Sequence, residues 1–212
     1  QSNIDTEVAN RIADVNAEET ARIAGDTHSG DVTGPHTDLQ IGVGVVGSPE
    51  IEATLRALRC LNAPWGAGIG MRHLTVSTVG LVPQIRRLAQ ERLQVTLAVS
   101  LHAPDDALRT RLVPINARWP VRDLLASSAD YVRTVGRRVS FEYVLLDGVN
   151  DGPDQAALLG ERLADAARAI AATPAQSWHV NLIPWNPVYG MQYRRPGHPR
   201  VAAFVRELEH RG

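Results

Sequence analysis

The sequence predicts an α/β fold in which parallel strands form an open sheet or a partial (β/α) barrel covered by helices. From residue 41 onward, short apolar segments alternate with longer segments of helical spacing. The apolar segments are near-continuous in Val, Leu and Ile, which is typical of buried parallel strands. Right-handed crossovers then place the strands side by side in one layered domain.

The individual elements follow from this alternation. Strands are predicted at 41–46, 73–78, 95–102, 139–146 and 178–185. Helices are predicted at 51–61, 81–91, 104–112, 121–135, 153–172 and 199–211. In the third helix Pro104 suits the first turn, and the two aspartates after it complement the positive end of the helix.

The chain divides into two regions by charge. Residues 1–40 are polar and hold eight acids against two arginines, whereas residues 41–212 hold fifteen acids against twenty arginines. Residues 8–24 could form one helix, and the rest of the first region has a loop-like composition. We therefore expect an acidic N-terminal segment at 1–40 and the core domain at 41–212. The modestly basic body is compatible with RNA binding.

Composition excludes several classes of protein. No apolar run approaches the ~20 residues of a membrane span, and no signal peptide is visible, so we expect a cytoplasmic protein without a membrane partner. The chain has no lysine, which excludes Schiff-base and pyridoxal-phosphate chemistry. The sequence begins with Gln1 rather than Met, which favours a partial chain.

The single cysteine limits the metal chemistry of the chain. Cys60 cannot form an internal disulfide, and it cannot supply several thiolates to a cluster or zinc site. Its position in the amphipathic segment 51–61 predicts that it packs in the core.

Polar residues gather where the predicted strands end. In parallel α/β sheets, ligands bind at the carboxyl ends of the strands. A functional site is therefore expected among Ser77 and Thr78, Ser100 to His102, Asp147 to Asp151, and Pro184 to Asn186.

Each of these signals also has an alternative interpretation. Gly42, Gly44 and Gly47 match the spacing of a dinucleotide-binding loop, but no acid follows about 20 residues later. His102 suits either a ligand contact or a structural role at the strand end. A serine hydrolase is disfavoured because no G-x-S-x-G motif is present. Asn150 could cap the next helix or hold its own loop.

Two further features concern charge. Glu142 lies within an apolar strand, where a carboxylate needs hydrogen-bonding partners. Arg194 and Arg195 beside Tyr193 could contact phosphate and bases, or could form a basic surface loop.

Four long segments, in this order, resemble the RlmN-type radical-SAM methyltransferases. They are residues 72–85, 97–116, 141–151 and 180–196, and the resemblance extends over about 53–211. It implies a partial (β/α) barrel of the radical-SAM type. It also implies methylation of C2 of an adenine in 23S ribosomal RNA, with transfer RNA as an open second substrate. The chain is expected to act as a monomer.

The resemblance also implies a cofactor site. In this family S-adenosylmethionine is contacted by residues that correspond to Ser77, Ser100, Leu101, His102 and Asn186. Hydroxyl, imidazole and amide groups at strand ends can hold the ribose and amino-acid parts of such a cofactor.

The chain departs from the family pattern in two places. Val45 or Val46 stands where a Gly-Glu-Pro turn carries an acid, and one residue is inserted there. The family's [4Fe–4S] cysteines would precede residue 1, and its methyl-carrying cysteine would follow residue 212. No catalytic or metal-ligating residue is therefore assigned in this chain, which is expected to be inactive by itself. A non-catalytic RNA- or ribosome-binding relative, and a nucleotide-binding α/β enzyme of another family, remain as alternatives.

Overall fold

The structure, a computed structural model, describes residues 39–43, 48–187 and 192–211. Five parallel strands form one sheet in the order β1-β2-β3-β4-β5. Their bounds are β1 Leu39–Val43, β2 Leu74–Thr78, β3 Thr96–Ser100, β4 Val139–Leu145 and β5 Trp178–Pro184. The α/β prediction and its five strands are confirmed.

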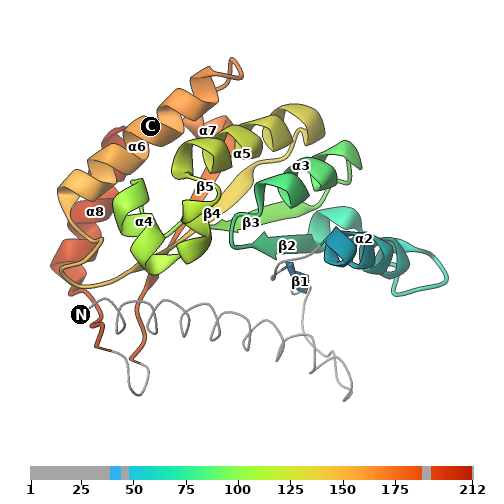
Figure 1. The fold of residues 1–212 in the computed structure, drawn as a ribbon, viewed down its shortest axis with the longest axis horizontal. Coiled ribbons are helices and arrows are strands. Elements are labelled where there is room, and N and C mark those ends of the chain that lie inside the picture. Colours follow the sequence, from blue (N-terminus) through green and yellow to red (C-terminus); the bar gives the residue numbers. More distant parts are fainter. Residues whose placement is uncertain (1–38, 44–47, 188–191, 212) are drawn as a thin grey trace.

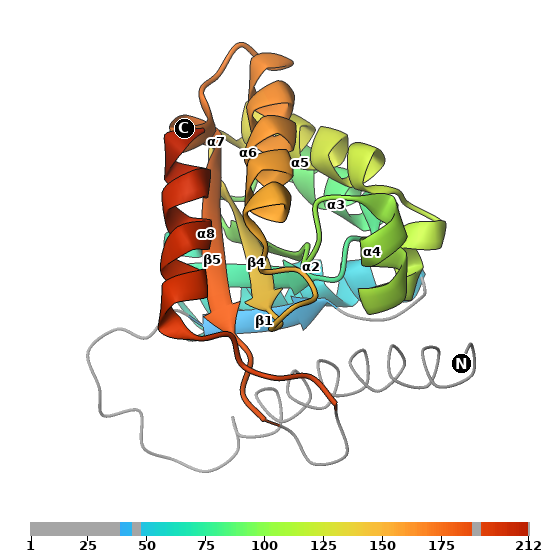
Figure 2. The same ribbon diagram turned by 90° about the vertical axis from the view of Figure 1, so that its left-hand side faces the viewer.

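The helices α2 to α7 lie in the connections between successive strands, and α8 follows β5. The helices lie against one face of the sheet (Figures 1 and 2). The α-helices are α2 Ser48–Asn62, α3 Val82–Gln90, α4 Asp106–Leu112, α5 Val121–Val135, α6 Pro153–Arg168, α7 Pro174–Ser177 and α8 His198–His210. Two 3₁₀ helices, η2 Met71–His73 and η3 Pro114–Ala117, complete the described elements.

Alternate residues of β4 show how the sheet divides the molecule. Phe141 and Tyr143 are fully buried in the core under the helices, whereas Ser140 and Glu142, which alternate with them, are only partly buried. Because successive side chains of a strand point to opposite faces, the second set lies on the face that the described helices leave uncovered. We call this the open face.

The strand order bears on the dinucleotide-loop alternative. A doubly wound nucleotide-binding sheet reverses its strand order at the point where the ligand binds. The five described strands run in sequence order without a reversal, as in a partial barrel. The glycine spacing at Gly42 therefore lacks the topology that the dinucleotide fingerprint requires, and 44–47 lie outside the described residues.

Three local predictions were wrong. Cys60 is exposed, because the buried hydrophobic positions of α2 are Ile51, Leu55 and Leu58 and Cys60 follows Leu58 by about 200° around the helix. Pro104 lies outside α4, whose N-cap is Asp105. The helix predicted at 153–172 ends at Arg168. The helix predicted at 8–24 and most of the segment 1–40 lie outside the described residues.

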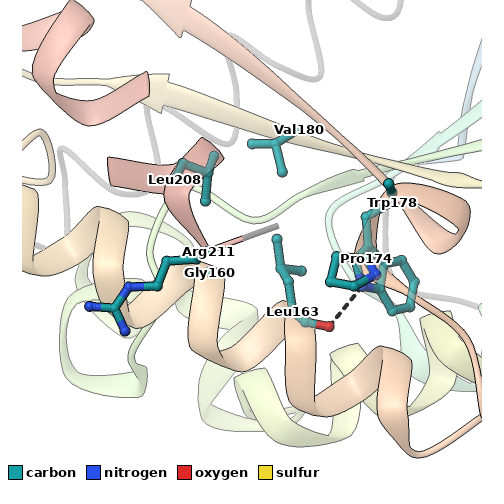
Figure 3. A pocket seen from close by; sticks show the side chains of 8 residues that line it. Gly160, Leu163, Pro174, Trp178, Val180, Leu208 and Arg211 are labelled. Carbon is teal, nitrogen blue, oxygen red and sulfur yellow. Dashed lines mark hydrogen bonds between the residues drawn. The ribbon is translucent and has the colours of Figure 1, made fainter. Parts of the chain in front are cut away.

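A cavity of about 80 Å³ opens between α6, α7, β5 and α8, on the helical side of the sheet (Figure 3). Leu163, Trp178 and Leu208 line it, and the Trp178 indole N–H donates to the Leu163 carbonyl at 2.8 Å. Ligand pockets for drug-sized molecules measure about 300–1,000 Å³, so this cavity is too small for a nucleoside cofactor.

Position 80, just beyond β2, requires glycine for two reasons. Its φ is +104°, and a Cβ there would lie 3.0 Å from Arg109 Nη2 and 3.1 Å from Leu124 Cδ1. We predict that Gly80→Ala lowers the free energy of unfolding by about 2–4 kcal/mol, from backbone strain and overpacking together. Denaturant unfolding measures this change.

Gly136 provides the matched control for that prediction. Its φ is +73°, and a Cβ at this position would meet no atom within 4 Å. Gly136→Ala should cost only the left-handed backbone term, about 1–2 kcal/mol. Equal losses in the two variants would show that the space beside Gly80 is not restrictive.

Candidate functional site

The predicted site residues are distributed along one edge of the sheet. All described strands are parallel, so their carboxyl ends share that edge. Ser77 is the penultimate residue of β2, Ser100 is the last residue of β3, and Asn186 follows β5 by two residues. A hydrogen bond from the Trp185 N–H to the Leu145 carbonyl, 3.1 Å long, extends the β4–β5 pairing toward Asn186.

Ser77 and Ser100 lie on the open face. Val76 and Val99 are buried in the core under the helices, and the serine that follows each of them is partly buried on the other side. Their hydroxyl groups can donate and accept hydrogen bonds there.

Leu101 lies on the opposite side from the two serines. Its side chain is fully buried in the main core. Its N–H donates to the Glu142 carbonyl at 3.0 Å, and its carbonyl accepts from Arg109 Nε at 3.1 Å. Leu101 therefore anchors the end of β3, and its side chain does not reach the open face.

The His102 side chain accepts the hydrogen bond that would otherwise continue the β3–β4 pairing. In a regular parallel ladder the Val144 N–H would donate to the Leu101 carbonyl. Instead it donates to His102 Nδ1 at 3.1 Å, while the backbone of His102 turns away with φ +58°. Because Nδ1 accepts this bond, the neutral ring carries its proton on Nε2.

Burial keeps the His102 ring neutral. The side chain is 6% exposed, and desolvation, followed by the charge of Arg109, lowers its pKa from 6.5 to about 3. The ring is therefore an N–H donor through Nε2 at neutral pH, with its orientation fixed by β4.

Arg109, which was not among the residues predicted from the sequence, joins the ends of two strands. Its fully buried guanidinium donates from Nη2 to the carbonyls of Val79 (2.9 Å) and Ser100 (2.8 Å) and from Nη1 to Asn116 Oδ1 (3.0 Å). Burial lowers its pKa to about 10, so the group stays charged at neutral pH. The available signal was its spacing from Leu112, the other buried residue of α4.

Asn150 closes the same edge from the β4 side. Its Oδ1 accepts from the Leu146 N–H at 2.7 Å, and its Nδ2 donates to the carbonyls of His102 (2.8 Å) and Val144 (2.6 Å). Of the two roles considered for Asn150, the structure shows that it holds its own loop. The helix α6 begins after Gly152, whose N–H donates to Gln155 Oε1.

An ion pair ties α8 to this loop. Arg200 donates to both carboxylate oxygens of Asp151 at 2.6 Å, and Asp151 is almost fully buried. Beside it, the Asp147 N–H donates to the Arg194 carbonyl at 2.9 Å. The loop that carries Arg194 therefore returns alongside the strand ends.

The arginines of that loop are exposed, and one of them contacts a predicted site residue. Arg194 is 84% exposed and lies 3.9 Å from Asp147, and Arg195 Nη1 donates to Asn186 Oδ1 at 3.4 Å. Trp185 packs edge-on against Tyr193 with ring centroids 5.8 Å apart. The indole thus contributes to the packing of this loop.

The described residues provide no metal centre. Among them, no group of three or more His, Cys, Asp or Glu side chains could hold a metal ion. Cys60 lies near the end of α2, outside the strand-end edge. No described helix is long and apolar enough to cross a membrane. Val45 and Val46 lie outside the described residues.

No family model matches the chain, but individual proteins do. Proteins named "Probable dual-specificity RNA methyltransferase RlmN" are 54% identical over 157 residues in Roseiflexus sp. (strain RS-1) and 50% identical over 159 residues in Symbiobacterium thermophilum. Each match covers 74% of this chain, and it covers 39% and 40% of the respective relatives. The chain thus spans about two fifths of these curated relatives.

Solved structures agree with the sequence matches. A radical SAM methyltransferase from Sphaerobacter thermophilus has a TM-score of 0.71 and 42% identity, covering 95% of this chain and 54% of that one. A domain of pyruvate-formate lyase-activating enzyme from Bacteroides vulgatus has a TM-score of 0.53 over 81% of this chain and 94% of that domain. At 18% identity, this second likeness concerns the fold alone.

The sequential parallel sheet and these structural neighbours define a radical-SAM partial barrel. Within that class, the chain belongs to the RlmN-type family.

The low pKa of His102 predicts a pH dependence of stability. The unfolded imidazole binds a proton below about 6.5, but the folded one does so only near 3. The contribution of the neutral His102 ring to the free energy of unfolding is therefore complete above pH 6.5. It falls as the pH decreases toward 3, by at most about 1.4 kcal/mol per pH unit. Urea unfolding at a series of pH values measures this slope.

His102→Asn is the comparison variant. Asparagine tolerates positive φ, and its Oδ1 can accept the Val144 N–H, but it does not titrate. The pH slope between 6.5 and 4.5 should be smaller in this variant by about one proton's contribution. Identical slopes would mean that His102 is protonated in the folded protein.

The hydrogen bonds of Arg109 predict that even the conservative substitution Arg109→Lys lowers the free energy of unfolding substantially. In Arg109→Lys one ammonium group cannot reach all the carbonyls that the planar guanidinium joins. Buried acceptors left unsatisfied cost about 1–3 kcal/mol each, so we expect a loss of roughly 2–4 kcal/mol in denaturant unfolding. Arg111→Lys, at an exposed position of the same helix, should change stability by less than about 0.5 kcal/mol; similar effects at both positions would contradict the proposed importance of the buried network.

Proposed function

We propose that this chain is the central part of an enzyme that methylates C2 of an adenine in 23S ribosomal RNA, with S-adenosylmethionine as cofactor. The observation that carries the proposal is the polar carboxyl edge of the sheet. It holds Ser77, Ser100 and Asn186 at the ends of three parallel strands, and His102 is fixed there as a neutral donor. Family membership adds the identity of the cofactor.

The cofactor site uses these residues in different ways. Ser77 and Ser100 offer hydroxyl groups on the open face, and Asn186 offers an exposed amide. Leu101 acts through its neighbours, because its core side chain and bonded backbone fix the flanking Ser100 and His102. Hydroxyl and amide groups of this kind fit the ribose and amino-acid parts of S-adenosylmethionine.

The iron–sulfur cluster of the family does not fit these residues. A [4Fe–4S] cluster needs several thiolates, and the sequence contains Cys60 alone. We therefore assign neither a cluster ligand nor a catalytic residue to this chain, and we expect no methyl transfer from these 212 residues by themselves.

The RNA partner is supported by charge and by family membership. Twenty arginines against fifteen acids in residues 41–212 favour a polyanionic partner. Ribosomal RNA is the substrate we propose, and transfer RNA is a second candidate because the relatives are named dual-specificity RNA methyltransferases. We propose that the protein acts in the cytoplasm as a monomer.

A non-catalytic RNA-binding relative is the second candidate. The two candidates differ in their dependence on the cofactor. The binding relative would bind an rRNA fragment but not S-adenosylmethionine, whereas the enzyme core would bind both.

Isothermal calorimetry with S-adenosylmethionine tests the proposed cofactor site. Removing one neutral hydrogen bond costs about 0.5–1.5 kcal/mol, or roughly a two- to tenfold loss of affinity. We expect losses of this size for Ser100→Ala and Asn186→Ala, and none for His210→Ala at the far end of α8. Equal affinity in all four proteins would place the ligand elsewhere, and no binding by the unmodified chain would contradict the cofactor assignment.

A further inference from the structure

Glu142 is an acidic residue in the mostly apolar strand β4. None of the proposed cofactor contacts involves it. It lies in the middle of β4, partly buried, on the open face. Its Oε1 accepts from the Ser140 hydroxyl at 2.7 Å, and its Oε2 accepts from Asn181 Nδ2 at 2.6 Å. Both carboxylate oxygens are thereby held in place from the strand and from its neighbour β5.

This arrangement leaves hydrogen-bonding capacity unused. An ionised carboxylate has about four acceptor positions, and the bonds from Ser140 and Asn181 occupy two of them. No arginine or histidine forms an ion pair with Glu142 in the described part of the chain. Each oxygen can therefore accept one more donor from the open side.

The register of the sheet places this carboxylate beside the proposed cofactor site. Ser100 is the direct partner of Glu142 across β3–β4, and Asn181 is its partner across β4–β5. Neighbouring strands are about 4.8 Å apart, and paired residues point to the same face. A ligand that contacts the Ser100 hydroxyl therefore lies next to the Glu142 carboxylate.

We propose that Glu142 binds the two neighbouring ribose hydroxyls of the nucleoside cofactor, with Ser140 and Asn181 as its positioning residues. This inference rests on the proposed function for the presence of a nucleoside at Ser100. Two hydroxyls on adjacent ring carbons offer paired donors to the two oxygens of one carboxylate. Acidic side chains recognise ribose in the same way in dinucleotide-binding proteins.

The alternative role for the carboxylate is attraction of a positive charge on the cofactor. The two roles are separated by using 5′-methylthioadenosine and its 2′-deoxy counterpart as ligands. Neither molecule carries the sulfonium or the amino-acid group, and they differ only in one ribose hydroxyl.

The experiment measures the affinity of the full 212-residue chain for both nucleosides by calorimetry. A hydrogen bond to a charged group contributes about 1.5–3 kcal/mol, so the 2′-deoxy compound should bind roughly 10- to 100-fold more weakly. In Glu142→Gln this discrimination should fall to a few-fold. Asn181→Ala, which keeps the carboxylate but removes one of its supports, should show an intermediate ratio.

Glu161→Gln, an exposed position on α6, is the matched control and should keep the full discrimination. Unfolding midpoints of all variants verify that each is folded. Unchanged discrimination in folded Glu142→Gln, or equal binding of the two nucleosides by the unmodified chain, would overturn the inference. Binding of S-adenosylmethionine without binding of either nucleoside would also overturn it, whereas failure of S-adenosylmethionine itself to bind would remove the proposed function and this inference together.

Discussion

The guanidinium of Arg109 is the group on which the arrangement of the strand ends depends. It takes up the carbonyl groups of Val79, Ser100 and Leu101, where β2 and β3 stop. A buried cation is stable only when its N–H donors have hydrogen-bond acceptors. These carbonyl groups are the acceptors, and they fix the orientation of the guanidinium. Because the Leu101 carbonyl already accepts from Arg109 Nε and from the Ala103 N–H, the Val144 N–H donates to His102 Nδ1 instead.

The position of the candidate site follows from this hydrogen bond between Val144 and His102. His102 adopts a positive φ, its imidazole is fixed against β4, and Asn150 holds its carbonyl from the following loop. Strand pairing thus ends in side-chain hydrogen bonds at the edge where Ser77 and Ser100 present hydroxyl groups. The large apolar side chains pack under the helices on the other face, which leaves polar side chains such as Glu142 on the open face.

The sequence was sufficient to predict the strands and most helices, because each apolar segment is short, rich in Val, Leu and Ile, and followed by an amphipathic segment. The sequence was insufficient where one side chain hydrogen-bonds to two strands that are distant in the chain. Arg109 looks like an ordinary helix arginine until the carbonyls of two distant strands surround it. Cys60 was misplaced because apolar character was weighed above its angular position on α2. The predicted strand ends already pointed to Ser77, Ser100, His102 and Asn186. Resemblance to a family supplied the identity of the cofactor, and contact of these residues with a ligand is still a prediction.

The central claim is that the open face at the carboxyl edge is the cofactor site, although the described cavity lies on the helical side. A crystal structure of the chain grown with S-adenosylmethionine tests this claim most directly. We expect electron density for the nucleoside across the ends of β2 to β5, beside Ser100 and Glu142. Density between α6 and α8, or a fully occupied ligand remote from the strand ends, would contradict it.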